Sequence, residues 1–353
     1  MKIALLTIWH SPNYGAEFQT YATVRKLKEM GHEVQVIDFR LHEQSKPVSL
    51  KGRISVYLHN CAPSQQHFIR FWNRYIPSTV HYLTPEELRR NPPMADLYLV
   101  GSDQVWNPQI TGDRATTYFL DFVPEGKKTA SYASSFGTNQ WMGDEVLTEI
   151  VKQRLEHFKA IGCREQRGCD IVRETFNLEA IHVVDPTLLH TSYPELTGKT
   201  THCRTLAYYQ LSENTALKEF AKRKAVEMGL KYVDVNHQTQ LTPTFTWYRR
   251  SIQQWIRTIA ESQFVITHSF HGLVLCLLYH RPFAIIYDNG NRGSRLVSLL
   301  QNVGLEDRLF TTISDAEKSD VWSRAIDFDK VDAILSAERN KSVEYLKRVT
   351  SKG

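Results

Sequence analysis

Two histidines three residues apart, His268 and His271, stand in the segment "ITHSFHGLVL", where an apolar run of strand type passes into one of helix type. Ser269 is a favoured N-cap residue, so a helix is expected to begin near Phe270 or His271. The first turn of a helix leaves backbone N–H groups without intrahelical partners, and its dipole favours negative charge. The segment therefore predicts an anion site that combines N–H donors with an imidazole.

Other interpretations of this pair stay open. A metal site would need a third ligand, and no HExxH pattern accompanies His268 and His271, so no metal is expected. A core histidine that only satisfies its own hydrogen bonds is the main structural alternative. Downstream, the glycine-rich stretch "NGNRGSRL" places Arg292 and Arg295 before another helix, which makes it a second candidate anion clamp.

Polar residues also follow apolar strands in the first half of the chain. In "WHSPNYGAEFQ", Asn13 suits a helix N-cap and Gly15 lets the backbone approach a ligand, although a plain tight turn is an alternative. The segment is neither GxGxxG nor a P-loop, so it indicates neither a dinucleotide nor ATP. In "LVGSDQVWNP", Asp103 suits a base or a helix cap, and Gln104, Trp106 and Asn107 are the hydrogen-bonding and stacking types of sugar sites.

Arginine and serine motifs complete the set of candidates. "GCREQRG" carries Arg164 and Arg167, whose planar guanidinium groups suit carboxylate or phosphate, and a solvated basic face is the alternative. "SYASSFG" is rich in serine, but it lacks the GxSxG elbow, so a serine hydrolase is not expected.

The elements that must position these residues alternate between strand and helix. Apolar runs at 2–9 and 32–39 flank a helical pattern over 18–31, and the rhythm resumes at 96–108. After the polar segment 191–203 it restarts as strands 205–211, 230–236, 263–267 and 282–288 with helices 214–229, 251–262 and 271–281 between them. Two such series predict an α/β protein of two doubly wound, Rossmann-like domains facing each other across a cleft, over residues 1–195 and 196–353.

Composition excludes several classes of protein. A length of 353 residues suits two domains, and 42% hydrophobic with 23% charged residues describes a soluble globular chain. The net charge of +5 without a long Lys/Arg block argues against nucleic-acid binding and suits anionic small molecules or lipid headgroups. Signal-peptide and membrane-span patterns are missing. Five cysteines without CxxC spacing predict free thiols in a reducing cytoplasm.

The ordered set of motifs resembles the polysaccharide pyruvyl transferase family. The matching segments are "NYGAEFQTYA", "LVGSDQVWNP", "SYASSFG", "CRE", "VVDPTLL", "SFHG" and "RLVSLLQNVGLEDR". The resemblance implies a fold like that of GT-B glycosyltransferases, phosphoenolpyruvate as donor substrate with no further cofactor, and a pair of sugar hydroxyls as acceptor. The product would be a pyruvate ketal on the precursor of a surface or exported polysaccharide, with release of phosphate.

The resemblance also implies roles for particular residues. His271 corresponds to the family's active-site histidine and Arg164 to a donor-binding arginine. Some relatives carry Arg-Leu-His where this chain has Ser269-Phe270-His271, and many that share SFHG have an acidic or amide residue at the place of His268. For donor binding we expect Arg164, His268, Ser269, Gly272, Arg292 and Arg295, and for acceptor binding Asn13, Tyr14, Gly15, Asp103 and Gln104.

On this view the N-terminal domain holds the acceptor, and the C-terminal domain holds phosphoenolpyruvate, with the C-terminal helix packing back. The protein is expected in the cytoplasm, and a lipid-linked acceptor would bring it to the inner face of the membrane as a peripheral protein. One alternative is a GT-B glycosyltransferase that uses a nucleotide sugar, for which Asp288 is the nearby acidic candidate. Another is a non-catalytic glycan-binding relative.

Overall fold

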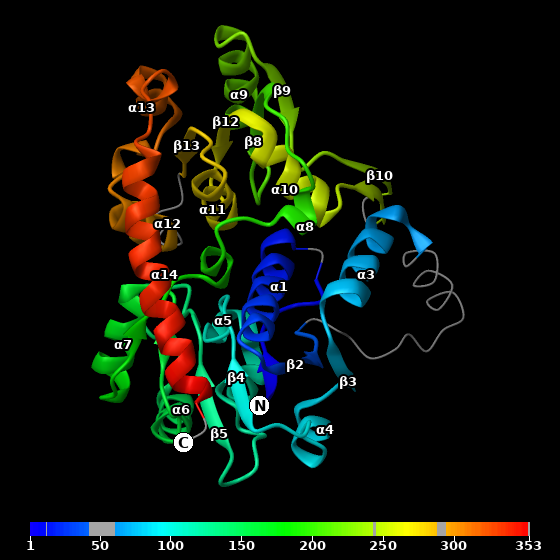
Figure 1. Ribbon diagram of the computed structural model, residues 1–353, viewed down its shortest axis with the longest axis vertical. Helices are drawn as coiled ribbons and strands as arrows, with labels where there is room; N and C mark the ends of the chain where they lie inside the picture. The colour runs from blue at the N-terminus through cyan, green and yellow to red at the C-terminus, as the bar shows by residue number, and fades with distance from the viewer. Residues whose placement is uncertain (12, 42–60, 243–244, 288–293, 352–353) are drawn as a thin grey trace. The chain divides into compact units, whose positions relative to one another are not determined.

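The computed structural model describes residues 1–11, 13–41, 61–242, 245–287 and 294–351 (Figure 1). The chain divides into two compact units, and each contains a five-stranded sheet. The first unit comprises Met1–Pro47, Phe71–His190 and Ser336–Gly353, and the second comprises Val48–Arg70 and Thr191–Leu335. The ranges 1–195 and 196–353, and the acceptor and donor sides given to them, stay predictions.

The sheet of the first unit is parallel throughout, with the strand order β3-β2-β1-β4-β5. Strands buried on both faces read as continuous apolar runs, which explains why "IALL" in the first strand has no polar alternation. The strands are β1 (Lys2–Leu6), β2 (Glu33–Phe39), β3 (Ser78–Tyr82), β4 (Leu97–Val100) and β5 (Lys128–Ser131).

Helices and short elements complete the first unit. Gly31, with φ +84°, follows α1 and supplies the left-handed residue at which that helix stops, as the sequence predicts. The elements are α1 (Tyr14–Glu29), α4 (Pro85–Arg90), α5 (Pro108–Thr111), η1 (Gly112–Phe119), α6 (Glu145–Glu156), β6 (Gly162–Cys163), α7 (Gln166–Phe176), β7 (Ile181–His182) and η2 (Pro186–Leu189). Two more helices, α3 (Pro63–Tyr75) and α14 (Phe328–Thr350), have residues in both units.

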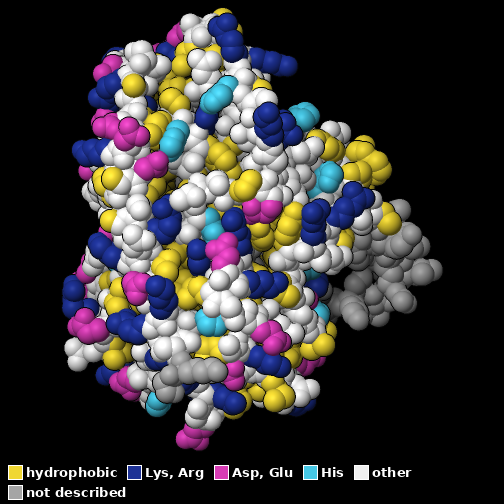
Figure 2. Space-filling model, viewed as in Figure 1, with side chains coloured by type: hydrophobic (Ala, Val, Ile, Leu, Met, Phe, Trp, Pro, Cys, Tyr) yellow, Lys and Arg dark blue, Asp and Glu magenta, His cyan; other side chains and the backbone are white. Residues whose placement is uncertain are grey.

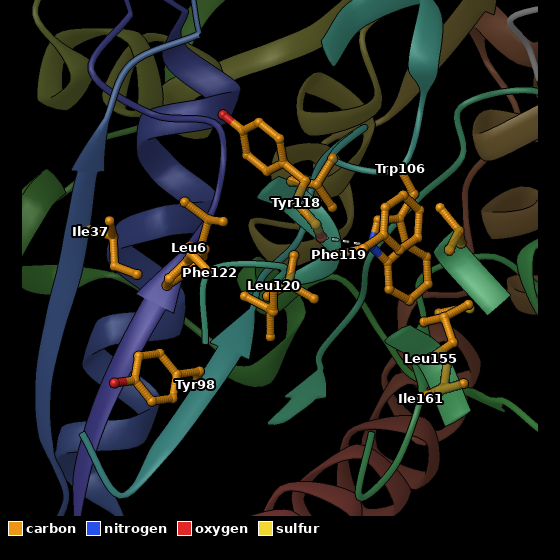
Figure 3. Close-up of a cluster of buried hydrophobic side chains, with 14 of the residues drawn as sticks. Leu6, Ile37, Tyr98, Trp106, Tyr118, Phe119, Leu120, Phe122, Leu155 and Ile161 are labelled. Atoms are coloured by element: carbon orange, nitrogen blue, oxygen red, sulfur yellow. Dashed lines mark hydrogen bonds between the residues drawn. The ribbon is translucent and has the colours of Figure 1, made fainter. Parts of the chain in front are cut away.

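Trp106 belongs to the hydrophobic core of the first unit, not to its surface (Figure 3). Its side chain is fully buried, its ring stacks on Phe119 at 5.3 Å, and its Nε1 donates to the carbonyl oxygen of Tyr118 at 3.1 Å. A buried indole whose N–H is already bonded is a packing residue. The interpretation of Trp106 as a sugar-stacking residue is therefore wrong.

The second unit has its own parallel sheet, with the order β14-β13-β12-β8-β9. Its strands are β8 (Cys203–Tyr209), β9 (Lys231–Asp234), β12 (Ser262–Thr267), β13 (Phe283–Ile286) and β14 (Leu309–Phe310). Its helices are α8 (Pro194–Thr197), α9 (Thr215–Glu227), α10 (Ile252–Glu261), α11 (Phe270–Leu278), α12 (Ser294–Val303), η3 (Glu306–Arg308), α13 (Ile313–Lys318) and η4 (Asp320–Trp322). The alternation of strand and helix confirms the predicted α/β class.

An antiparallel hairpin, β10 (Gln238–Thr242) and β11 (Phe245–Arg249), is inserted between β9 and α10. The sequence did not indicate it, because every residue of β10 is exposed and its composition is polar. A strand without a buried face lacks the alternation by which strands are recognised.

Surface and thiol chemistry agree with the composition. In the face shown in Figure 2, Lys and Arg side chains are interspersed with Asp and Glu, as expected for a small net charge. All five cysteines are free thiols, as predicted: Cys61, Cys163, Cys169, Cys203 and Cys276. Across the described part of the chain, no helix combines the length and the apolar composition needed to cross a bilayer.

Candidate functional site

Each sheet has one place where the strand order reverses, and ligands of open α/β sheets bind beside it, beyond the carboxyl ends of the strands. In the first unit this switch point lies between β1 and β4, and in the second it lies between β8 and β12. The predicted site residues Asn13 and Asp103 follow β1 and β4, and His268 and His271 follow β12. The strand order thus places predicted site residues beside the switch point of each unit.

The loop after β1 is held by the start of α1. Asn13 is the N-cap, as predicted, and its Oδ1 accepts from the backbone N–H of Gly15 at 3.0 Å and of Ala16 at 3.4 Å. Asn13 itself is exposed, whereas Tyr14 and Gly15 are buried. Among these three residues only Asn13 is exposed to solvent. The alternative of a plain tight turn therefore explains most of the segment "NYG".

A buried carboxylate in the first turn of α1, which bonds this loop, was missed from the sequence. Glu17 has no exposed surface, and its two oxygens accept from the Ser11 backbone N–H at 2.8 Å and from Trp72 Nε1 at 2.6 Å. Burial raises the pKa of Glu17 to about 8, and these hydrogen bonds offset only part of that effect. The signal in the sequence is a single acidic residue on a helix face that is otherwise buried.

His10 also lies in this loop and adopts a left-handed backbone with φ 58°. Its ring stacks on Trp72 at 3.7 Å. Burial and the nearby Arg40 lower the pKa of His10 to about 4, against the opposing effect of Asp38, so the imidazole is neutral at neutral pH.

The left-handed backbone of His10 has two counterparts in the same unit. Asp103 after β4 and Ala133 after β5 have φ of 75° and 56°, so three strands of one sheet are followed by a left-handed residue that is not glycine. Left-handed non-glycine residues gather at functional sites.

Asp103 and Gln104 lie half-buried after β4. Asp103 Oδ1 accepts from the backbone N–H of Gln104 at 2.9 Å, and Gln104 Oε1 accepts from Asn107 Nδ2 at 3.2 Å. Gly137 of "SYASSFG" has φ +68°, and a Cβ added there would lie 2.0 Å from Gln104 Oε1. The glycine therefore makes room for the glutamine, so the two motifs meet in the structure.

Arg164 is buried among carboxylates, so the interpretation of it as part of a solvated basic face is wrong. Its Nε bonds Glu165 Oε1 and its NH1 bonds Asp185 Oδ2, both at 3.0 Å, while NH2 lies 4.0 Å from Asp103 Oδ1. Burial alone would lower the pKa of Arg164, but these carboxylates more than offset it and raise the pKa. Arg167, by contrast, is partly exposed and pairs with Glu174.

The second unit builds its site around the start of α11. Ser269 is the N-cap, as predicted, and its Oγ accepts from the Gly272 backbone N–H at 3.3 Å. His271 is the second residue of the helix and only 7% exposed, with its ring 5.3 Å from that of Phe270. The helix start brings backbone N–H groups and an imidazole to the carboxyl edge of the sheet, where the sequence predicts an anion site.

Gly272 allows this helix to approach the sheet. A Cβ added there would lie 2.7 Å from Thr267 Oγ1 and 3.1 Å from Tyr209 Cδ1. Since real Cβ atoms do not come so close to other atoms, only glycine fits while the first turn of α11 rests against the ends of β8 and β12. The role of Gly272 in this structure is thus close packing.

His268 differs from His271 in its surroundings. Its Nε2 accepts from the backbone N–H of Leu211 at 3.1 Å, and its ring lies 5.9 Å from that of Tyr287. A neutral histidine that accepts at Nε2 carries its proton on Nδ1. His268 therefore joins the ends of β8 and β12 at the switch point.

Among the remaining predicted residues, Arg295 lies half-buried in the first turn of α12. Arg292 and Asp288 fall outside the described residues. Over the part of the chain that is described, no three His, Cys, Asp or Glu side chains are grouped so that they could hold a metal ion.

Three solved structures show which fold this chain shares. A protein from Listeria monocytogenes assigned as a UDP-N-acetylglucosamine 2-epimerase is 12% identical, with a TM-score of 0.57 over 100% of this chain and 98% of that one. Medicago truncatula UGT71G1, complexed with UDP-glucose, is 8% identical, with a TM-score of 0.53 over 99% and 98%. The UDP-GlcNAc 2-epimerase of Methanocaldococcus jannaschii is 9% identical, with a TM-score of 0.51 over 100% and 94%. The predicted GT-B-like fold is confirmed.

No curated protein sequence matches the chain. The family model described as polysaccharide pyruvyl transferase matches residues 13–290. The matched range begins at Asn13, the N-cap of α1, and it includes the loop after β4 and the start of α11. This match covers more than half of the chain, and it contains six of the seven motifs on which the resemblance rests; "RLVSLLQNVGLEDR", at 295–308, lies beyond it. The chain therefore belongs to the polysaccharide pyruvyl transferase family.

Proposed function

We propose that this protein moves the enolpyruvyl group of phosphoenolpyruvate onto two hydroxyls of a sugar in the precursor of a surface or exported polysaccharide. The observation that carries the proposal is the family match over residues 13–290. The reaction takes place in the cytoplasm, and a lipid-linked acceptor brings the protein to the inner face of the membrane.

The chemistry consists of one proton transfer and two additions at the same carbon. A proton is added to the methylene carbon of phosphoenolpyruvate, which becomes a methyl group and leaves an oxocarbenium-like centre at C2. One sugar oxygen bonds to C2 and loses its proton; the bond from C2 to the phosphate oxygen then breaks, and phosphate leaves. The second hydroxyl bonds to C2 and closes the ketal. The two hydroxyls release two protons. One replaces the proton that was added to the methylene carbon, and the other leaves with phosphate.

In the second unit, His271 is the proposed proton donor to the methylene or the phosphate. The positive end of the α11 dipole, beside Ser269 and Gly272, suits the anionic oxygens of the donor. The backbone N–H groups of Ser269 and Gly272 themselves bond Thr267 Oγ1 and Ser269 Oγ. His268 supports the same edge by bonding Leu211. The proposed mechanism requires no metal.

In the first unit, Asn13, Tyr14, Gly15, Asp103 and Gln104 are the proposed acceptor residues. Arg164 is proposed as a donor contact from the family resemblance alone. Its guanidinium is already paired with Glu165 and Asp185, and this pairing favours a further task, which is to hold the Asp103 loop in place.

His271→Gln tests the function. With phosphoenolpyruvate and a glycan acceptor, we expect phosphate release to fall by about 100-fold or more, because a positioned acid typically contributes at least that much. The circular dichroism and the melting temperature should stay close to those of the wild type. His280→Gln is the matched control, since His280 lies in the same unit, is half exposed and pairs with Asp332 at 3.0 Å. EDTA should leave the rate unchanged.

Two outcomes would contradict the proposal. Thermal-shift titration would measure binding of both donors. A protein that binds a nucleotide sugar and does not bind phosphoenolpyruvate would be a GT-B glycosyltransferase. If the His271→Gln variant retained its full cellular role, the protein would be a glycan-binding relative without catalysis.

A further inference from the structure

Gln210 lies at the switch point of the second unit, directly after β8. The pairs Tyr208–Ile266 and Tyr209–Thr267 join β8 to β12, so the next positions along the two strands are Gln210 and His268. On the other side, Tyr208 pairs with Asp234 of β9, which places Asn236 beside Gln210 as well. Polar residues thus follow three adjacent strands at the edge where open α/β sheets bind ligands.

The backbone around Gln210 is fixed on both sides. Its carbonyl oxygen accepts from Asn236 Nδ2, and the backbone N–H of the next residue, Leu211, donates to His268 Nε2 at 3.1 Å. The side-chain amide is therefore attached to a well-bonded segment.

The side-chain amide of Gln210 has no such bonds. The residue is only 2% exposed, and within the described residues neither Oε1 nor Nε2 has a hydrogen-bond partner. Gln19 provides a partial contrast: it is fully buried in the first unit, and its Nε2 lies within hydrogen-bond distance of Thr7 Oγ1, Ile8 O and Thr20 Oγ1 at 3.0, 3.3 and 2.9 Å. Its Oε1 has no partner within the described residues, so only one half of that amide is paired, whereas both halves of the Gln210 amide are unpaired.

Such an amide lowers the stability of the unliganded protein, because burial removes its hydrogen bonds to water and nothing replaces them. An apolar side chain of the same size would avoid that loss. Buried polar groups in folded proteins are nearly always paired, so an unpaired one at a ligand-binding edge points to a partner that the chain does not supply.

We propose that Gln210 is a ligand-binding residue of the second unit and that its amide contacts a phosphate-bearing ligand with at least one hydroxyl hydrogen. Nε2 donates to a phosphate oxygen, and Oε1 accepts from a P–OH or a sugar hydroxyl, so both halves of the amide are used. The identification of phosphoenolpyruvate as this ligand rests on the proposed function. Inorganic phosphate and a nucleotide sugar share the same chemistry, and the test separates these sources.

The test compares Gln210→Met with the wild type in thermal-shift titrations with phosphoenolpyruvate, inorganic phosphate and UDP-glucose. Without ligand, Gln210→Met should melt at the wild-type temperature or above, since it removes an unpaired amide. Its half-saturating concentration for the ligand that shifts the wild type should rise by about tenfold or more, as expected for a lost hydrogen bond to a charged group. The control Gln19→Met should melt below the wild type, because it removes the hydrogen bonds that Gln19 Nε2 donates.

The outcomes separate this inference from the proposed function. A Gln210→Met protein that melts below the wild type, or does not fold, would show that the amide supports the native structure, and the inference would be wrong. Equal titrations for the two proteins, or no response of the wild type to any of the three ligands, would also overturn it. A response to UDP-glucose alone, weakened in the variant, would support the role of Gln210 and contradict the pyruvyl transferase function.

Discussion

Glu17 is a residue whose chemistry is set almost entirely by its surroundings. No part of it is exposed, yet both oxygens accept hydrogen bonds from N–H groups, an arrangement that favours the ionised form. Burial favours the neutral form and prevails, which raises the pKa from 4.5 to about 8. Through its bonds to Ser11 and Trp72, Glu17 holds the loop that carries His10 and precedes Asn13.

This shift predicts how stability depends on pH. Between about 4.5 and about 8 the folded protein binds a proton at Glu17 that the unfolded chain has released. Stability should therefore be greatest below that window and fall as the pH rises through it, by about 5 kcal/mol at most. Urea unfolding of the wild type and of Glu17→Gln at pH 5 and pH 8 measures the effect. The difference in unfolding free energy between the two proteins should change with pH, and a constant difference would contradict the raised pKa.

At the scale of elements, a short strand-to-helix connection forms the site of the second unit. Ser269 caps α11 and its backbone N–H donates to Thr267 Oγ1 at 3.0 Å, so the turn is bonded at both ends. Gly272 then allows the first turn of the helix to rest on Thr267 and Tyr209. The position of His271 follows from these contacts, because it lies between the cap and the glycine, directly before Gly272.

Gly272→Ala should displace this turn. The added Cβ would lie 2.7 Å from Thr267 Oγ1, and a β-branched side chain on a strand has little freedom to move. We expect a loss of about 1–3 kcal/mol in the free energy of unfolding, together with weaker donor binding. Gly168→Ala is the matched control, since Gly168 is also the third residue of its helix and its nearest contact, Cys163 Cβ, is 3.1 Å away. Equal losses in the two variants would contradict the argument.

At the scale of the whole molecule, the end of the chain completes the first unit. The residues of α14 from Ser336 onward belong to that unit, and Tyr345, Leu346 and Val349 are buried there. Tyr345 donates its hydroxyl hydrogen to the carbonyl oxygen of Ser131 at 2.7 Å, at the carboxyl end of β5. The sheet edge that carries Ala133 and Ser134 is therefore supported by residues more than 200 positions later in the sequence.

Leu346→Ala tests this support. A leucine only 1% exposed should lose about 2–5 kcal/mol of stability when it is truncated. Hydrogen exchange should speed up at β5 and at residues 132–135. The neighbouring Lys347→Ala is the control, because its side chain is 59% exposed and should change stability by less than about 0.5 kcal/mol. A first unit that keeps its protection in Leu346→Ala would show that the helix end is dispensable.

Much of the architecture could be predicted because it depends on local patterns. Apolar runs, helix caps at Asn13 and Ser269 and the stop at Gly31 are properties of neighbouring residues, and each appears where the sequence placed it. The β10–β11 hairpin escaped because its first strand has no buried face. Trp106 was misassigned because a tryptophan next to polar residues looks the same in a core as in a sugar site.

By itself, the sequence determined the α/β class, the alternation of strand and helix and the family, since periodicity and motif order are written along the chain. Only the tertiary structure decided which polar side chains are buried and what they meet. Arg164 became part of a carboxylate cluster, His268 a link to Leu211, and Gln210 an unpaired amide among the described residues. The physical reason is that charge compensation and hydrogen-bond pairing depend on distances between residues far apart in the sequence, and no local pattern encodes those distances.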